Sequence, residues 1–164
     1  MTAAVRSALD VTQITDQLYV GAQPPADAAA ALRALNIGLI ISMRAEARPP
    51  AVFSQPPLSL LWLSTWDSFF IPIPLKALER GARAALPVLE RGQAVLAHCH
   101  RGRHRGVAMG AAILIAQGAT AADAMQLLRE RRDIADPDIW HIRRQIVRFE
   151  RRWRTQPYPA RVSF

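Results

Sequence analysis

Apolar and polar positions divide the chain into two kinds of segment. Largely unbroken apolar runs at 38–42, 58–63 and 93–98 are typical of β-strands that are buried on both faces. Shorter apolar stretches at 13–14 and 18–20 predict two more strands near the start of the chain. The residues from 65 to 74 are punctuated by prolines and predict a loop.

Between and after the strands, apolar residues recur every three or four positions, which is the period of a helix packed on one side. The predicted helices cover 27–35, 75–91, about 103–117, 120–132 and a last segment with the apolar stripe Ile139, Ile142, Ile146, Phe149 and Trp153. Thr120 and Asp123 have the spacing of a capping box. The 103–117 segment is apolar nearly all round, so we expect it at the centre of the domain.

Alternation of strands and helices predicts an α/β fold with a mostly parallel central sheet of four or five strands, flanked by helices. No internal repeat, linker or low-complexity segment divides the chain, so we expect residues 1–164 to form a single domain. In open sheets of this kind, sites lie at the carboxyl ends of the strands. We therefore expect the site where the strand ending at His98 meets the following helix.

Composition narrows the class of protein. About half of the 164 residues are apolar, which is enough for a packed core and argues against disorder. No apolar stretch approaches the roughly 20 residues that span a bilayer, and the first residues lack a signal-like run. The single cysteine excludes an internal disulfide and suits a reducing compartment. We expect a cytoplasmic protein with no membrane span.

The net charge of +8 favours anionic partners. Phosphorylated substrates, acidic lipids and nucleic acid all satisfy that condition. Arginines on the last helix would suit nucleic acid, but a solvated helix face explains them more simply, so we do not expect a nucleic-acid partner. The oligomeric state stays open.

The candidate chemistry lies in the segment from Ala97 to Gly106. Cys99 and Arg105 are separated by five residues, between a predicted strand and a predicted helix. A strand-to-helix turn aims successive backbone N–H groups into a concave nest that suits a tetrahedral dianion, and the helix N-terminus adds its positive dipole end. Gly102 would permit the tight backbone path.

In that electrostatic field we expect the Cys99 thiol to ionise, and a thiolate is the nucleophilic form of cysteine. Arg105, one turn into the helix, would offer a two-pronged fork to two phosphoryl oxygens. The residues thus favour phosphoryl chemistry.

The pattern formed by His98, Cys99, Gly102 and Arg105 resembles the signature loop of the protein tyrosine phosphatase superfamily, in its compact dual-specificity branch. The resemblance extends to residues 14–21, which are similar to that branch's opening strands. It also extends to Pro137-Asp138 and residues 145–150, which are similar to its closing helix.

The resemblance implies roles for individual residues. Cys99 would displace the alcohol or phenol and form a cysteinyl-phosphate, while Asp67, 32 positions upstream, would protonate the leaving oxygen and later activate water. Glu46 is the other upstream acid and is set aside as a poor rival. His98 would support the loop through backbone hydrogen bonds.

One departure concerns Gly106, where the family usually has a serine or threonine whose hydroxyl helps the thiolate leave.

The variable positions of the loop are expected to help bind phosphate, and they are His100, Arg101, Arg103 and His104. Because His98, Cys99 and His100 are consecutive, they do not have the spacing of a structural zinc site, so no metal is expected. No nucleotide-binding motif occurs, and no cofactor is expected.

The expected substrate is a phosphorylated protein. Phosphotyrosine is the residue we expect first to be hydrolysed, and phosphoserine or phosphothreonine are further candidates. Trp66, Phe69 and Phe70 flank Asp67 and are candidates either to line the pocket or to pack in the core. Two alternatives remain. The first is a phosphatase for non-protein polyanions such as a phosphoinositide, an inositol phosphate or an RNA 5′ end. The second is a phosphate-binding module with slow turnover.

Overall fold

A five-stranded sheet forms the centre of the computed structural model, which describes residues 9–156. Its strands are β1 (Val11–Thr15), β2 (Leu18–Ala22), β3 (Ile37–Ser42), β4 (Ser59–Trp62) and β5 (Ala94–Cys99). Their order across the sheet is β1-β2-β5-β3-β4. Only β1 runs antiparallel to its neighbour, so the predicted mostly parallel sheet is confirmed.

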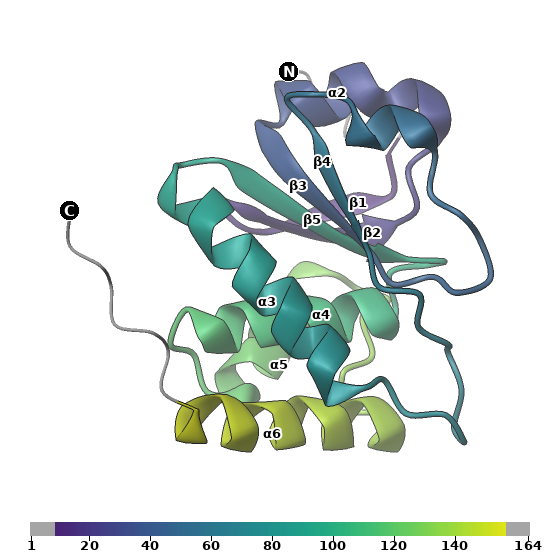
Figure 1. Cartoon of the computed structure of the whole chain (residues 1–164). Helices are drawn as coiled ribbons and strands as arrows, with labels where there is room; N and C mark the ends of the chain where they lie inside the picture. The colour runs from purple at the N-terminus through teal and green to yellow at the C-terminus, as the bar shows by residue number, and fades with distance from the viewer. Residues whose placement is uncertain (1–8, 157–164) are drawn as a thin grey trace.

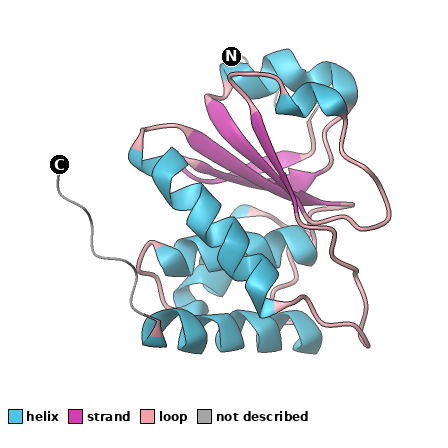
Figure 2. Ribbon diagram, viewed as in Figure 1, coloured by secondary structure: helices cyan, strands magenta, loops and turns pink. Residues whose placement is uncertain are grey.

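Helices cover both faces of this sheet (Figures 1 and 2). One face carries the short elements η1 (Ala26–Ala28), α2 (Ala29–Ala34) and η2 (Ala51–Ser54). The other carries α3 (Leu75–Glu90), α4 (Arg105–Ala116), α5 (Ala121–Arg131) and α6 (Trp140–Thr155). The α/β fold class is confirmed. None of the helices within residues 9–156 has the length and apolar character needed to cross a membrane.

The alternating side chains of β3 show why the apolar runs are continuous. Ile40 points into the core beneath α2 and η2, whereas Leu39 and Ile41 point into the core beneath α3 and α4. Every residue of β3 and of β5 is buried. A strand enclosed on both faces needs apolar residues at odd and even positions alike.

Helix α4 lies at the centre of the helical layer, as its composition predicts. Residues 105–115 are all buried, and α4 packs against α3, α5, α6, β2 and β5. The Thr120 hydroxyl accepts a 3.0 Å hydrogen bond from the Asp123 N–H, which confirms the predicted cap of α5.

Most predicted boundaries differ from the observed ones by one or two residues, and three differences affect the description of the elements. Strand β5 continues to Cys99, which still pairs with Ala22 of β2. Helix α4 begins at Arg105 and not near 103, since Gly102 has a positive φ of 65° that interrupts helical geometry. The helix predicted at 27–35 is split: Ala28 N–H bonds to Pro25 O in a tighter 3₁₀ turn before α2 starts.

Candidate active site

The loop that joins β5 to α4 lies at the carboxyl edge of the sheet. Because β5 lies between β2 and β3, its end is flanked by both neighbouring strands. Cys99 is the last residue of β5 and Arg105 is the first residue of α4. We call residues 99–105 the phosphate loop. It stands at the edge where the sequence predicted the site, one residue later than expected.

Gly102 is required in the phosphate loop for two reasons. Its φ of 65° is one that side chains disfavour, and an added Cβ would lie only 2.4 Å from the carbonyl carbon of Gly21. In this conformation the Gly102 N–H donates to the Cys99 Sγ at 3.2 Å. That contact stabilises negative charge on the sulfur.

Arg132 holds the phosphate loop from its outer side. Its guanidinium donates to the carbonyl oxygens of Arg101 and Gly102, both at 2.8 Å, and also to Thr12 and Asp10. Arg132 is 4% exposed. Because Arg132 binds these two carbonyl oxygens on one side of the loop, it favours the peptide orientation in which the Gly102 N–H points at the Cys99 sulfur. Sequence reasoning missed Arg132, which looks like any other arginine in an arginine-rich chain.

Arg105 is buried and is held by three acceptors. Its Nη1 donates to the carbonyl oxygens of Met43 and Thr65 at 3.1 and 2.8 Å, and its two Nη atoms form a fork onto Glu46 at 2.8 Å each. The Nε atom is buried and has no hydrogen-bond partner within the described part of the chain. A buried donor of this kind calls for an acceptor, and a phosphoryl oxygen is one that fits.

Glu46 serves as the carboxylate partner of Arg105. The hydrogen bonds from Arg105 lower the pKa of Glu46 to about 2. Both Glu46 oxygens accept hydrogen bonds from Arg105, which agrees with setting Glu46 aside as a general acid. The sequence contained no local signal for this pairing, because 59 positions separate the two residues.

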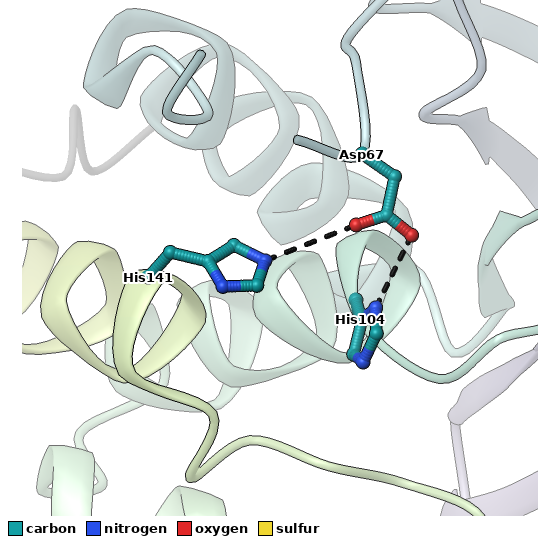
Figure 3. A group of neighbouring side chains, drawn as sticks. All are labelled: Asp67, His104 and His141. Atoms are coloured by element: carbon teal, nitrogen blue, oxygen red, sulfur yellow. Dashed lines mark hydrogen bonds and ion pairs between the residues drawn. The ribbon is translucent and has the colours of Figure 1, made fainter. Parts of the chain in front are cut away.

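Asp67 lies with Cys99 in one cavity of about 200 Å³, which is also lined by His100, Arg101, Arg103 and His104. The structure thus brings the proposed acid and the proposed nucleophile together. An Asp67 oxygen lies 3.1 Å from His104 Nδ1, and its other oxygen lies 3.9 Å from Nε2 of His141 (Figure 3). His141, in the first turn of α6, was not among the residues predicted for the site.

His98 and Gly106 pack directly behind the phosphate loop. His98 is fully buried, with Nδ1 3.4 Å from the Cys99 carbonyl oxygen, and burial lowers its pKa to about 4. It is therefore a neutral group at physiological pH. Gly106 lies against β5: an added Cβ would be 3.3 Å from the Ala97 carbonyl oxygen and from the Cys99 nitrogen.

The aromatic residues beside Asp67 do not match either expectation. Trp66, Phe69 and Phe70 are 53%, 55% and 93% exposed, so none is a core residue. None of them lines the cavity that holds Cys99. Phe69 instead packs against Trp140 and His141 of α6. In this part of the proline-rich loop Asp67 lines the cavity, whereas the three aromatic side chains lie on the surface.

Comparison with known proteins supports the fold. No protein-family model matches the sequence, and no curated protein sequence does. Human DUSP28 superposes with a TM-score of 0.77 at 22% identity, over 88% of this chain and 95% of the other.

Two further solved structures agree. PTPMT1, in a structure with PI(5)P, gives a TM-score of 0.77 at 19% identity over 88% of this chain and 97% of its own. DUSP15 gives 0.71 at 20% identity over 90% and 97%. This chain therefore has the fold of the compact dual-specificity phosphatases.

Proposed function

We propose that the protein is a cysteine-dependent phosphatase that hydrolyses phosphomonoesters through a cysteinyl-phosphate. The observation that carries the proposal is the shared cavity: the Cys99 sulfur, under the Gly102 N–H, lies beside Asp67. The buried, unpartnered Nε of Arg105 in the next turn supports the same conclusion. The arrangement supplies a nucleophile, an anion site and a proton donor.

The reaction has two balanced steps. In the first, the Cys99 thiolate attacks phosphorus, the P–O bond to the alcohol or phenol breaks, and Asp67 gives its proton to the leaving oxygen. In the second, water attacks phosphorus, Asp67 accepts a proton from that water, and the P–S bond breaks to restore the thiolate. Loop N–H groups and Arg105 stabilise the charge on the phosphoryl oxygens in both steps.

Phosphotyrosine is the first substrate to test, and the cavity lining supports phosphoserine and phosphothreonine as further substrates. The residues that line the Cys99 cavity are polar or ionisable, and the neighbouring aromatic side chains are not among them. A cavity without an aromatic wall supplies little selectivity for an aryl group over an alkyl group.

A second candidate substrate class is a non-protein polyanion such as a phosphoinositide. Its specific support is the basic lining: exposed Arg101 and Arg103 border the same cavity as Cys99, beside His100 and His104. The PTPMT1 structure with PI(5)P shows that this fold accommodates such a ligand in another protein. Phosphate binding with slow turnover is the remaining alternative, and it is motivated by Gly106.

A substrate panel separates these functions. We expect purified protein to hydrolyse p-nitrophenyl phosphate and phosphotyrosine peptides, with phosphoinositides as the competing class. The variant Cys99→Ser should lose nearly all turnover, because the serine hydroxyl stays protonated where the thiol ionises. Arg105→Lys should lose nearly all turnover as well, because the single ammonium group of lysine cannot reproduce the two-pronged contact of a guanidinium. Retention of more than a few per cent of the rate by Cys99→Ser would overturn the covalent mechanism. Phosphate binding without turnover of any substrate would favour the binding module.

A further inference from the structure

Three side chains with metal-binding atoms meet at the edge of the Cys99 cavity: Asp67, His104 and His141 (Figure 3). They come from three different elements, namely the loop that precedes α3, the end of the phosphate loop and the first turn of α6. One ligand atom from each lies within 4.8 Å of the other two. In the sequence only the histidines beside Cys99 were considered as metal ligands; they were rejected on their spacing, and no metal was expected.

Hydrogen bonding does not account for the position of His141. Its side chain is 6% exposed, yet neither ring nitrogen has a hydrogen-bond partner among residues 9–156. The 3.9 Å from its Nε2 to the Asp67 oxygen is too long for a hydrogen bond. A buried imidazole with two unpaired nitrogens is an exception to the usual rule and needs a partner.

We propose that Asp67, His104 and His141 form a binding site for one divalent transition-metal ion, of which Zn²⁺ fits best. Two imidazoles and one carboxylate are the donor set of open zinc sites, which leave the fourth position to water or another ligand. Ca²⁺ and Mg²⁺ prefer a shell of oxygen atoms and are disfavoured here.

The donor atoms lie within 4.8 Å of one another, which is somewhat wider than the spacing around one bound ion. Ligand atoms of one tetrahedral Zn²⁺ lie about 3.3 Å apart, given bonds of about 2.0–2.1 Å. Here Asp67 Oδ2 lies 3.1 Å from His104 Nδ1, and Asp67 Oδ1 lies 3.9 Å from His141 Nε2. Asp67, which would have to approach the two imidazoles, is an exposed residue on a surface loop.

Metal binding would also affect the hydrolysis reaction, and this part of the inference rests on the proposed function. A carboxylate that coordinates Zn²⁺ cannot carry the proton that the leaving group requires. The ion would therefore act as a reversible inhibitor that captures Asp67 and leaves Cys99 and Arg105 in place. Esters with poor leaving groups should be affected most.

The binding experiment needs no enzymatic activity. Zn²⁺ is titrated into the full-length Cys99→Ser variant, which lacks the competing thiolate, and affinity is measured by calorimetry or by competition with a chromogenic chelator. We expect one Zn²⁺ per chain. Loss of one ligand in His141→Gln, His104→Gln or Asp67→Asn, each placed on the Cys99→Ser background, should weaken binding by about tenfold or more.

His100→Gln is the matched control, since His100 lines the same cavity but lies outside the cluster. Its Zn²⁺ affinity should stay within about twofold of the parent. The proposal is overturned if His100→Gln weakens binding as much as His141→Gln does, if Cys99→Ser binds no Zn²⁺, or if the ligand variants bind normally. Because His141 is buried, its replacement could disturb folding, whereas Asp67→Asn on the exposed loop tests the site independently of how His141→Gln folds.

A second readout uses Co²⁺ as a spectroscopic probe of the same variants. Tetrahedral coordination by two imidazoles should give visible absorption bands that His141→Gln shifts or abolishes. In wild type, Zn²⁺ should inhibit hydrolysis. For His141→Gln, inhibition is expressed relative to the rate of that variant without metal, and the same fractional inhibition should need at least about tenfold more Zn²⁺ than in wild type. If the protein binds Zn²⁺ through the cluster but hydrolyses nothing, the site stands and the proposed function fails.

Discussion

At the scale of single residues, we predict that Gly106 makes breakdown of the proposed phosphoenzyme slow. A hydroxyl at this position helps the thiolate leave in the phosphatases that the chain resembles, and glycine has none. We therefore expect rapid mixing with p-nitrophenyl phosphate to show a burst of nitrophenol close to one equivalent per site, followed by a slower steady rate. Gly106→Ser should raise that steady rate and shrink the burst.

The environment of Gly106 adds a constraint on this variant. A serine Cβ would lie 3.3 Å from three backbone atoms of residues 97–99, so β5 or α4 must shift by a few tenths of an ångström. We expect a stability cost of about 1 kcal/mol or less, measured by urea unfolding. If wild type shows no burst and the serine variant is no faster, breakdown of the intermediate is not limiting.

Asp67 is the second residue whose role can be separated chemically. In Asp67→Asn, hydrolysis of esters with poor leaving groups should slow by roughly 10² to 10⁴-fold, because general acid catalysis is lost. Esters whose leaving group needs no proton should slow far less. The measurement is kcat/KM across a series of aryl phosphates, with metal excluded by a chelator. Equal losses across the series would show that Asp67 only supports the loop.

At the scale of elements, the phosphate loop depends on the segment that follows α5. Arg132 binds the carbonyl oxygens of Arg101 and Gly102, and Arg132→Met would leave both without their donor. Because a misplacement of about 1 Å in a site costs on the order of 10²-fold, we expect kcat/KM to fall by about that much. The affinity for inorganic phosphate should fall with it.

Arg131→Met is the control for Arg132→Met. Arg131 is the neighbouring residue and is exposed, so its loss removes the same charge without touching the loop. Its kinetics and its phosphate affinity should match wild type. If both variants lose activity to the same extent, the effect is one of net charge and the loop does not need Arg132.

At the scale of the whole molecule, His98 makes stability depend on pH. Its pKa is lowered from 6.5 to about 4 in the folded protein because it is buried in strand β5, between β2 and β3. The unfolded chain therefore binds a proton that the folded chain refuses. The free energy of unfolding is therefore unaffected by His98 above pH 6.5. It falls as the pH drops toward 4, by roughly 3 kcal/mol in total.

Urea unfolding at several pH values between about 7.5 and 3.5 measures this loss, since that window spans the pKa of 6.5 in the unfolded chain and the pKa of about 4 in the folded chain. In His98→Gln the dependence on pH should be much weaker than in wild type. His141 shifts in the same direction, so the difference between the two proteins, and not the wild-type curve alone, isolates His98. Parallel curves would show that other groups control acid sensitivity.

The amino-acid sequence by itself determined the elements and the phosphate loop. The buried strands β3 and β5 and the buried helix α4 could be recognised as continuous apolar stretches, because enclosure on all sides removes every polar position. The expectation that the run at 58–63 is also buried on both faces is wrong, since β4 lies at the edge of the sheet and none of its four residues is buried. Cys99, Gly102 and Arg105 could be recognised because they share one short turn, in which spacing along the chain sets spacing in space. The fold class and the edge of the sheet at which the site lies follow from those local patterns.

The tertiary structure alone decided which distant residues complete the site. Glu46 reaches Arg105 across 59 positions, and Arg132 reaches Gly102 across 30. His141 joins Asp67 only because α6 packs against α4 and brings its first turn to the cavity edge. Sequence spacing carries no information about such pairs, since nothing local distinguishes the buried arginines from the many exposed ones. Burial and partnership are set by packing, and packing exists only in the folded chain.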